Sequence, residues 1–339
     1  MPVGSQATVK ATTPEQLSDL GAEIILANAY HLFLRPGHRL IGGLGGLHSF
    51  MGWDGPILTD SGGYQIFSLS DLRKVNDDGV SFRSHLNGDP FFLSPELSVD
   101  IQHALRSDIV MVLDDCLPYP SEFDVARTSM RRSLEWARRC RSHLDSKPSQ
   151  DQGLFGIVQG AVYKELREES AIRLMEMEFE GYALGGLSVG EPIPAMYEVI
   201  EEVEPTLPRD RPRYLMGVGT PANLVECVAR GIDMFDCVMP TRHARNGWLF
   251  TASGHIAINH ARFKDDSRPI DSDCGCPVCG KYSRAYLRHL FLSKEILSSM
   301  LNTVHNLFFY LDTMRKIRHF IEIERFNELL TQFRSVRAQ

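Results

Sequence analysis

The 339-residue chain lacks several features that would assign it to a special class of protein. It has no long apolar run, so we expect no transmembrane span, and its N-terminus has no basic stretch followed by an apolar one, so we expect no signal peptide. No internal repeat, low-complexity tract or Gly/Ser linker divides it. Its seven cysteines do not suggest a disulfide framework, because three of them are clustered. These absences predict a globular protein of the reducing cytoplasm with no membrane contact.

Positive charge is also scarce overall, since the formal net charge is −7. This balance argues against a protein that coats nucleic acid with its whole surface. Residues 242–294 are the exception, with nine Lys or Arg against four Asp. That segment carries about +5 and the remainder about −12. A basic face on an acidic protein is typical of a selective polyanion binder, although an ordinary solvated surface would look the same.

What the chain does contain is an alternation of short apolar runs and helical patterns. Apolar runs of this length are typical of strands buried on both faces of a parallel sheet, and the alternation predicts an α/β protein. Ser94 is a predicted N-cap for the first clear helix, with Pro95 in its first turn. The apolar runs are residues 24–28, 57–60, 109–114, 155–159, 182–186, 214–217 and 234–238, and the helical patterns include 95–107, 125–144, 164–179 and 221–230.

Most of the apolar runs end in a residue that is capable of chemistry. In a (β/α)8 TIM barrel the C-termini of the strands converge on one mouth, where the active site lies. A doubly wound open sheet, the main alternative, would instead concentrate function at one switch point. The distribution over many strand ends favours the barrel, with residues 1–4 as its eighth strand. The chemically capable ends are Asn28, Asp60, Asp114, Gln159, Gly186 and Asp236.

Three cysteines form a compact C-x-C-x-x-C sequence, at Cys274, Cys276 and Cys279. In a turn-forming frame of Gly and Pro, this spacing is typical of a metal knuckle, and zinc is the expected metal. A fourth ligand is needed, and His289 and His305 both lie downstream. On spacing alone, both remain candidates.

The loop-rich composition around these cysteines indicates an inserted subdomain. Residues 253–283 are rich in Gly, Asp, Pro and Cys, whereas the tail from residue 285 has a helical pattern. We therefore expect three parts. They are a barrel that carries the active site over residues 1–252, a zinc-binding subdomain over 253–311, and a C-terminal helix over 312–339 that completes the barrel.

Two aspartates at strand ends suggest glycosidic chemistry. Asp60 precedes Gly62 and Gly63, which allow the backbone to approach a ligand, and Tyr64, which can stack on a flat group. Asp236 ends a strand that we expect to be buried, and a buried carboxylate is costly unless it is paired or used. One carboxylate can attack an anomeric carbon while the other moves protons. Either aspartate can also be structural, in a turn or a salt bridge.

A third carboxylate could read a base. Asp114 accepts hydrogen bonds from N–H groups, Gln159 can donate to a carbonyl oxygen, and the Gly185-Gly186 backbone adds a further donor. Such a set matches the hydrogen-bonding edge of a purine-like base.

These residues belong to motifs that run in one order along nearly the whole chain. Together the motifs resemble those of the bacterial tRNA-guanine transglycosylases, also called queuine tRNA-ribosyltransferases. The motifs are residues 28–32 (NAYHL), 59–65 (TDSGGYQ), 113–116 (LDDC), 155–160 (FGIVQG), 185–191 (GGLSVGE), 214–221 (YLMGVGTP), 235–242 (FDCVMPTR), 245–247 (RNG) and the cysteine cluster.

The resemblance implies a barrel pentosyltransferase that exchanges a base in tRNA without cutting the strand, through a covalent enzyme–RNA intermediate. Asp236 matches the nucleophile, which attacks the ribose of the guanosine at wobble position 34, and Asp60 matches the general acid/base. His305 matches the fourth ligand of one closed, structural Zn²⁺. The residues that match the base pocket are Ser61, Gly62, Gly63, Tyr64, Asp114, Gln159, Gly186, Leu187 and Met216. Those that match contacts to the anticodon loop are Gly217, Val218, Gly219, Thr220, Pro221, Ala222, Asn223, Thr241, Arg242, His243, Ala244 and Arg245.

The resemblance also implies substrates and assembly. Val189 and Cys116 match the bacterial pattern, which implies exchange of guanine for 7-aminomethyl-7-deazaguanine in queuosine biosynthesis. The tRNAs would be those with G-U-N anticodons, for Asp, Asn, His and Tyr. Family members are usually homodimers with the zinc region near the interface. They usually carry a hairpin before the segment at residues 1–4 that closes the barrel floor, and we expect it to be missing here.

Several alternatives explain less of the sequence. Archaeal relatives have additional C-terminal RNA-binding domains, for which we expect no room, and the non-catalytic eukaryotic subunit lacks the catalytic aspartates. A carboxylate glycosidase on the same barrel does not explain the cysteines, and a zinc-dependent nucleic-acid binding module does not explain the carboxylates at strand ends. A zinc hydrolase or deaminase needs an open coordination position.

Overall fold

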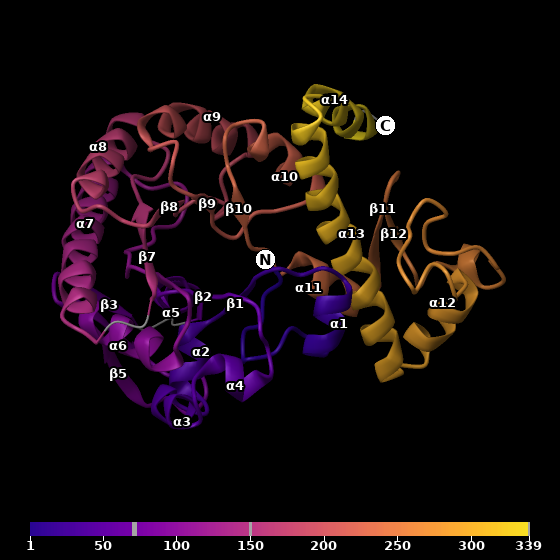
Figure 1. Cartoon of the computed structure of the whole chain (residues 1–339), viewed down its shortest axis with the longest axis horizontal. Helices are drawn as coiled ribbons and strands as arrows, with labels where there is room; N and C mark the ends of the chain where they lie inside the picture. Colours follow the sequence, from indigo (N-terminus) through magenta and orange to yellow (C-terminus); the bar gives the residue numbers. More distant parts are fainter. Residues whose placement is uncertain (70–72, 149–150, 338–339) are drawn as a thin grey trace.

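A curved sheet of seven parallel strands forms the centre of the protein (Figure 1). The computed structural model describes residues 1–69, 73–148 and 151–337. The strands follow one another around the sheet in chain order. Because they are parallel, each strand is joined to the next by a crossover connection on the outer face of the sheet. All seven apolar runs predicted from the sequence form strands. The strands are β1 (Ile25–Ala27), β2 (Ile57–Thr59), β6 (Ile109–Met111), β7 (Gly153–Val158), β8 (Gly181–Leu184), β9 (Arg213–Leu215) and β10 (Met234–Phe235).

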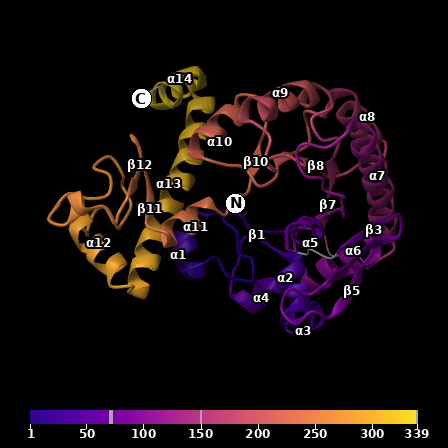
Figure 2. The same cartoon turned by 180° about the vertical axis from the view of Figure 1, so that it is seen from behind.

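The first residues of the chain join the two edges of this sheet. Pro2 forms a parallel bridge with Cys237, just after β10, and Val3 forms one with Leu26 in β1. The backbone N–H of Leu26 donates to the Pro2 carbonyl at 3.0 Å. The N-terminus accordingly lies near the middle of the molecule in both views (Figures 1 and 2). The predicted barrel is confirmed, and residues 1–4 take its eighth position.

Helices surround the ring of strands (Figure 1). The first long one, α6, begins as predicted, because the Ser94 side chain accepts from the backbone N–H of Leu97 and Pro95 lies in the first turn. The longer outer helices are α6 (Pro95–Leu105), α7 (Phe123–Asp145), α8 (Lys164–Met175), α9 (Ile193–Val203) and α10 (Pro221–Val228), with the 3₁₀ turn η1 (Glu204–Thr206) after α9. Shorter helices are α1 (Pro14–Asp19), α2 (Ala29–Leu34), α3 (His38–Gly43), α4 (Leu47–Met51) and α5 (Gly63–Leu69).

A small antiparallel sheet lies between β2 and α6 in the sequence and was not predicted. It consists of β3 (Lys74–Asn76), β4 (Gly79–Arg83) and β5 (Pro90–Leu93). Its β3–β4 turn packs on α7, where the buried Trp136 donates its indole N–H to the Asp77 carbonyl at 2.8 Å. Arg139 donates to the same carbonyl at 3.0 Å and pairs with Glu96 at 2.7 Å.

The C-terminal part of the chain lies beside the ring of strands (Figure 1). It includes the cysteine cluster. Its helix α13 runs without a break through residues 311 and 312, where the sequence suggested a domain limit. A continuous helix neither supports nor excludes a limit at this point, and the three-part domain division stays a prediction. The elements here are α11 (Met239–Arg245), β11 (Trp248–Thr251), β12 (Gly254–Ala257), the 3₁₀ turn η2 (Ala261–Phe263), α12 (Arg284–Leu292), α13 (Ile296–Glu322) and α14 (Phe326–Arg337).

One continuous apolar core joins the strands to the helices and extends into the C-terminal part. Strands β1, β2 and β9 are buried along their whole length, as expected for parallel strands covered on both faces. Within the described ranges, no helix combines the length and the apolar character needed to cross a membrane.

Candidate active site and metal centre

Asp60 lies directly after β2, and a set of donors holds its carboxylate in place. Asn28, which directly follows β1, donates from its side-chain amide to Oδ2, and Gln65 donates to the same oxygen at 2.8 Å. The backbone N–H of Ala29 donates to Oδ1 at 2.8 Å. Burial raises the pKa of Asp60 from 3.8 to about 6, although these hydrogen bonds act in the opposite direction. The group therefore exchanges a proton near neutral pH, as a general acid/base must.

Asp236 follows β10, and two donors hold one of its oxygens. The hydroxyl of the buried Tyr214 donates to Oδ1 at 2.5 Å, and the backbone N–H of Gly217 donates to the same oxygen at 2.7 Å. No protein donor is recorded at Oδ2 among the described residues. Asp236 therefore presents one oriented oxygen and one oxygen available for attack, which is the arrangement that a carboxylate nucleophile needs.

The two aspartates belong to one site. The Asp236 carboxylate contributes to the raised pKa of Asp60, and both carboxylates contribute to the raised pKa of Tyr214, after the larger effect of burial in each case. Strands β2 and β10 are far apart in the sheet order, but the barrel brings their C-terminal ends to one mouth.

Asp114, Gln159 and Gly186 form a second cluster at the same mouth. The Gln159 side-chain amide donates to Asp114 Oδ2 at 2.7 Å, and its second N–H remains available for a ligand. Burial raises the pKa of Asp114 to about 6, and the neighbouring Asp115 adds to this shift. Gly186 has φ +63°, and a Cβ there would collide with the Gln159 side chain. The backbone conformation and the closeness of Gln159 therefore favour a glycine at this position.

The other predicted base-pocket residues lie around these two clusters. Ser61 is buried, and a hydrogen bond from its side chain acts to lower the pKa of Asp114, against the larger effect of burial. A Cβ on Gly63 would lie 2.9 Å from the Asp114 carbonyl, while Gly62 has φ +85°. Tyr64 is 48% exposed, so part of its ring can contact a ligand. Met216 is half-buried after β9 and Leu187 is buried after β8.

The residues predicted to contact RNA form two segments next to Asp236. Gly217 to Asn223 connect β9 to α10, where Thr220 and Asn223 form a capping box that fixes the helix start. Thr241 to Arg245 belong to α11, which begins three residues after Asp236. Arg242 and Arg245 are exposed, and His243 packs against Trp248 and Phe250.

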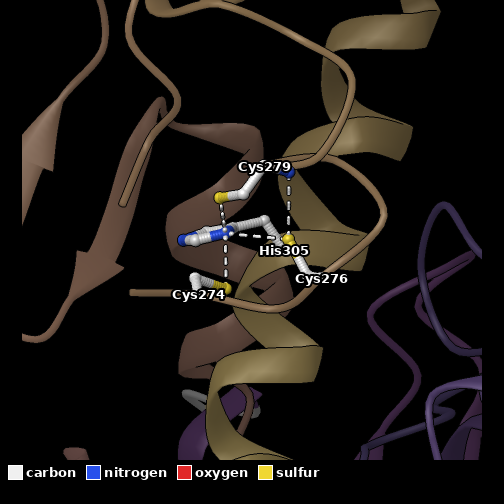
Figure 3. Close-up of side chains that lie close together, drawn as sticks. All are labelled: Cys274, Cys276, Cys279 and His305. Carbon is white, nitrogen blue, oxygen red and sulfur yellow. Dashed lines mark hydrogen bonds between the residues drawn. The ribbon is translucent and has the colours of Figure 1, made fainter. Parts of the chain in front are cut away.

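Cys274, Cys276, Cys279 and His305 converge on one point (Figure 3). The three Sγ atoms lie 3.8, 3.4 and 3.4 Å from His305 Nδ1. A tetrahedral Zn²⁺ at ordinary bond lengths separates its sulfur and nitrogen ligands by about 3.6 Å. His305 Nε2 lies 2.7 Å from the Phe250 carbonyl, so Nε2 donates and Nδ1 is free to bind a metal. These residues fit a metal ion, and His289 is not part of the cluster.

Three residues that orient the aspartates were not predicted to do so. Asn28 and Tyr214 occur in the recognised motifs, but only pairing of adjacent strands shows that they contact Asp60 and Asp236. The available signal was a polar side chain at the end of a buried strand for Asn28. For Tyr214 it was a hydroxyl within a buried strand, which requires a partner. Gln65 lies in α5, five residues after Asp60 in the same motif, and is not at the end of a strand.

Comparison with known proteins relates the chain to one family. A sequence model of the family described as queuine tRNA-ribosyltransferase matches residues 1–339. A queuine tRNA-ribosyltransferase of Caldanaerobacter subterraneus is 55% identical over 333 residues, which are 98% of this chain and 88% of that protein. One of Chromobacterium violaceum is 54% identical over 338 residues, covering 100% of this chain and 91% of the relative.

A third relative, from Staphylococcus aureus, has the same description and is 54% identical over 334 residues, which are 98% of this chain and 87% of its own. Agreement at this level over nearly the full length of each protein is far beyond what a shared barrel produces. The resemblance seen in the motifs is thereby confirmed, and the chain belongs to the queuine tRNA-ribosyltransferase family.

Proposed function

We propose that this tRNA-guanine transglycosylase exchanges the guanine at wobble position 34 of tRNAs with G-U-N anticodons for 7-aminomethyl-7-deazaguanine. The observation that carries the proposal is the pair of differently held carboxylates at one mouth. Asp236 is oriented through a single oxygen, whereas Asp60 is held through both and titrates at about 6. A double displacement at a sugar carbon requires one nucleophile and one proton carrier.

The two carboxylates divide the steps between them. Asp236 Oδ2 attacks the ribose C1′, the bond from C1′ to the guanine nitrogen breaks, and a protonated Asp60 supplies the proton that the leaving guanine needs. The incoming base then gives its N–H proton to Asp60, and its nitrogen attacks C1′ and displaces Asp236. Protons and electron pairs balance over the cycle, and two inversions retain the configuration of the sugar.

The second cluster supports recognition of a guanine-like edge. Asp114 would accept from the ring N–H and the exocyclic amine, while the free Gln159 N–H and the Gly186 backbone N–H would donate to the carbonyl oxygen. Tyr64 and Met216 would enclose the base plane, and the Leu187 carbonyl would accept from the aminomethyl group. The remaining predicted pocket residues, Ser61, Gly62 and Gly63, would line the same space.

The two segments around Asp236 would hold the anticodon loop. Gly217 to Asn223 would contact the backbone of the loop, and Arg242, His243 and Arg245 on α11 would contact its phosphates. Removal of the target base from its stack costs a few kcal/mol, which such contacts would offset.

The four-ligand cluster supports a structural Zn²⁺ with no open position for water or substrate. An ion bound there would join the loop that carries the cysteines to α13. We keep the division into a barrel and a metal-binding subdomain within the proposal, because β11, β12 and α12 lie outside the ring (Figure 1). The proposal places the enzyme in the cytoplasm, where thiols stay reduced.

The proposed enzyme is a homodimer that associates near the metal-binding subdomain. Apolar side chains at Tyr286, Leu292 and Ile296 support this surface, since they are 39%, 51% and 78% exposed.

Exchange of a labelled base tests the proposal. Purified protein is incubated with radiolabelled guanine and unmodified tRNA-Tyr, and label in the RNA is measured. We expect stable incorporation and, in a gel under denaturing conditions, a protein–RNA adduct when the reaction is trapped. Folded, metal-loaded protein that incorporates no label would disprove the transglycosylase assignment, and a tRNA without a G-U-N anticodon is the matched control.

A further inference from the structure

One face of α13 carries buried polar side chains that bond to other elements. Asn302, His305 and Asn306 are fully buried, and Tyr310 is 7% exposed. Buried polar groups are retained only where they find partners. All four here form hydrogen bonds to backbone atoms of the two segments proposed to contact RNA or of the strand that follows them.

Asn306 connects three chain segments. Its side-chain amide donates to the Pro240 carbonyl at 3.1 Å and to the Trp248 carbonyl at 2.9 Å. Its Oδ1 accepts from the backbone N–H of Phe250 at 3.1 Å. Asn302 donates to the Ala244 carbonyl at 3.3 Å. Both ends of α11, which follows Asp236, are therefore fixed to α13.

Tyr310 performs the same task for the other segment. Its hydroxyl donates to the Gly219 carbonyl at 3.0 Å. Two residues earlier, the backbone N–H of Gly217 donates to Asp236 Oδ1 at 2.7 Å. The segment at residues 217–219 is thus held by the nucleophile at one end and by α13 at the other.

We infer that Tyr310 and Asn306 are positioning residues for tRNA, which set the two RNA-contacting segments relative to Asp236. The inference rests on the proposed function. Neither side chain is placed in the base pocket, so both act through the backbone that they hold. His305 lies next to Asn306 on the helix, and the metal that it would bind fixes the position of α13. The metal site and the RNA surface are therefore coupled through one helix.

Tyr310→Phe isolates this role, because it removes one hydroxyl and keeps the packed ring. Loss of the bond leaves the Gly219 carbonyl without its partner and loosens the segment. We expect the KM for tRNA to rise roughly five- to tenfold. The KM for guanine, the metal content and kcat at saturating tRNA should stay within about twofold of the wild type. Asn306→Ala should raise the KM for tRNA further, since three bonds are lost.

Thr313→Val is the matched control, because within the described part of the chain the buried Thr313 hydroxyl bonds only to the Phe309 carbonyl of its own helix at 2.8 Å. It should leave both KM values unchanged. An unchanged KM for tRNA in Tyr310→Phe would overturn the inference, as would an equal rise in both KM values or a loss of metal, which indicate general destabilisation. Wild-type protein that exchanges no base would overturn the proposed function instead. In that case the dissociation constant for tRNA, measured by filter binding in the same variants, tests the positioning role.

Discussion

The barrel mouth and the cysteine cluster both bring together side chains that are distant in the sequence. The electrostatic environments of those side chains differ between the two sites. At the mouth, Asp60 and Asp114 are buried carboxylates whose pKa values are raised to about 6. Their environment resists the charge that they carry at neutral pH. In the cluster, three thiols and His305 Nδ1 surround one point and His305 Nε2 is bonded to the Phe250 carbonyl, so every polar atom has a defined partner once a metal is bound.

This difference indicates that the barrel mouth carries out the reaction and that the cysteine cluster stabilises the fold. A buried carboxylate whose pKa is raised toward neutral pH can both accept and release a proton at low cost, and this property is useful in a reaction. A closed coordination shell has no such freedom and contributes to folding. Changes at the mouth should therefore affect turnover with little effect on folding, and changes at the cluster should do the reverse.

The largest effect is expected from Asp236→Asn. The amide keeps the size of the side chain but is a poor nucleophile, so kcat should fall roughly 10⁴-fold or more. The metal content and the midpoint of thermal unfolding should be unchanged, in contrast to what we expect for changes in the cysteine cluster. Asp19→Asn, at the exposed end of α1, is the control for charge. A trapped protein–RNA adduct in Asp236→Asn would show that another residue is the nucleophile.

The pH dependence of base incorporation should reveal Asp60. Attack of the incoming base on the preformed protein–RNA adduct needs the charged form of Asp60, so the rate of this second step should rise about tenfold per pH unit below the pKa and level off above about 6. Stability should change in the opposite direction. The pKa in the fold lies above the ordinary 3.8, so this contribution to stability is complete below about pH 4 and is lost as the pH rises through about 6.

Asp60→Asn provides the control for this profile. It should lower incorporation by about 10²–10⁴-fold and remove the step near pH 6 from what activity remains. Persistence of that step in the variant would assign it to Asp114, the other carboxylate with a pKa of about 6.

Cys276→Ser should disrupt the metal cluster while leaving the two aspartates at the barrel mouth in place. The side chain is 1% exposed, and its loss leaves three ligands for the metal. We expect metal content to fall below half and the thermal midpoint to drop, with the KM for tRNA raised roughly tenfold. Cys140→Ser, a buried thiol in α7, should keep its metal. A Cys276→Ser protein with full metal content would contradict the ligand assignment.

The smallest effect is expected from Tyr214→Phe. Gly217 still holds Asp236 Oδ1, so only one of two orienting bonds is lost. We expect kcat to fall roughly fivefold, with no change in the KM for guanine. Tyr182→Phe is the control, because Tyr182 is another buried tyrosine of the same sheet. Equal effects in both variants would mean that the hydroxyl does not orient the nucleophile.

Sequence patterns predicted the strands and the mouth because both depend on local features. A short apolar run followed by a polar residue marks a buried strand and its end, and Asp60, Asp114, Gln159 and Asp236 all follow strands of the sheet. The order of strands around the barrel then follows from chain order. The family motifs added agreement over the whole chain, which the comparisons confirm.

Features that depend on contacts between distant segments were not predictable from patterns. The bond from Tyr214 to Asp236 exists because β9 and β10 are neighbours in register. Spacing alone left His289 and His305 equivalent, and only the path of α13 places one of them at the cysteines. The sheet of β3 to β5 is stabilised by Trp136 and Arg139 on α7, far along the chain, so its short strands carry little signal of their own.

The pairing of Pro2 with the chain just after β10 has a consequence for biosynthesis. The backbone nitrogen of Met1 lies 2.6 Å from the carbonyl oxygen of Phe235, which is 234 residues further along the chain. A ribosome makes the first of these residues early and the second only after most of the barrel has been translated. Until then the sheet has two unpaired edges, because the segment at residues 1–4 can pair on its second side only after β10 has been made. Closure of the ring is thus a late event in synthesis, and until then the unpaired strand edges expose backbone donors and acceptors that can pair with another chain.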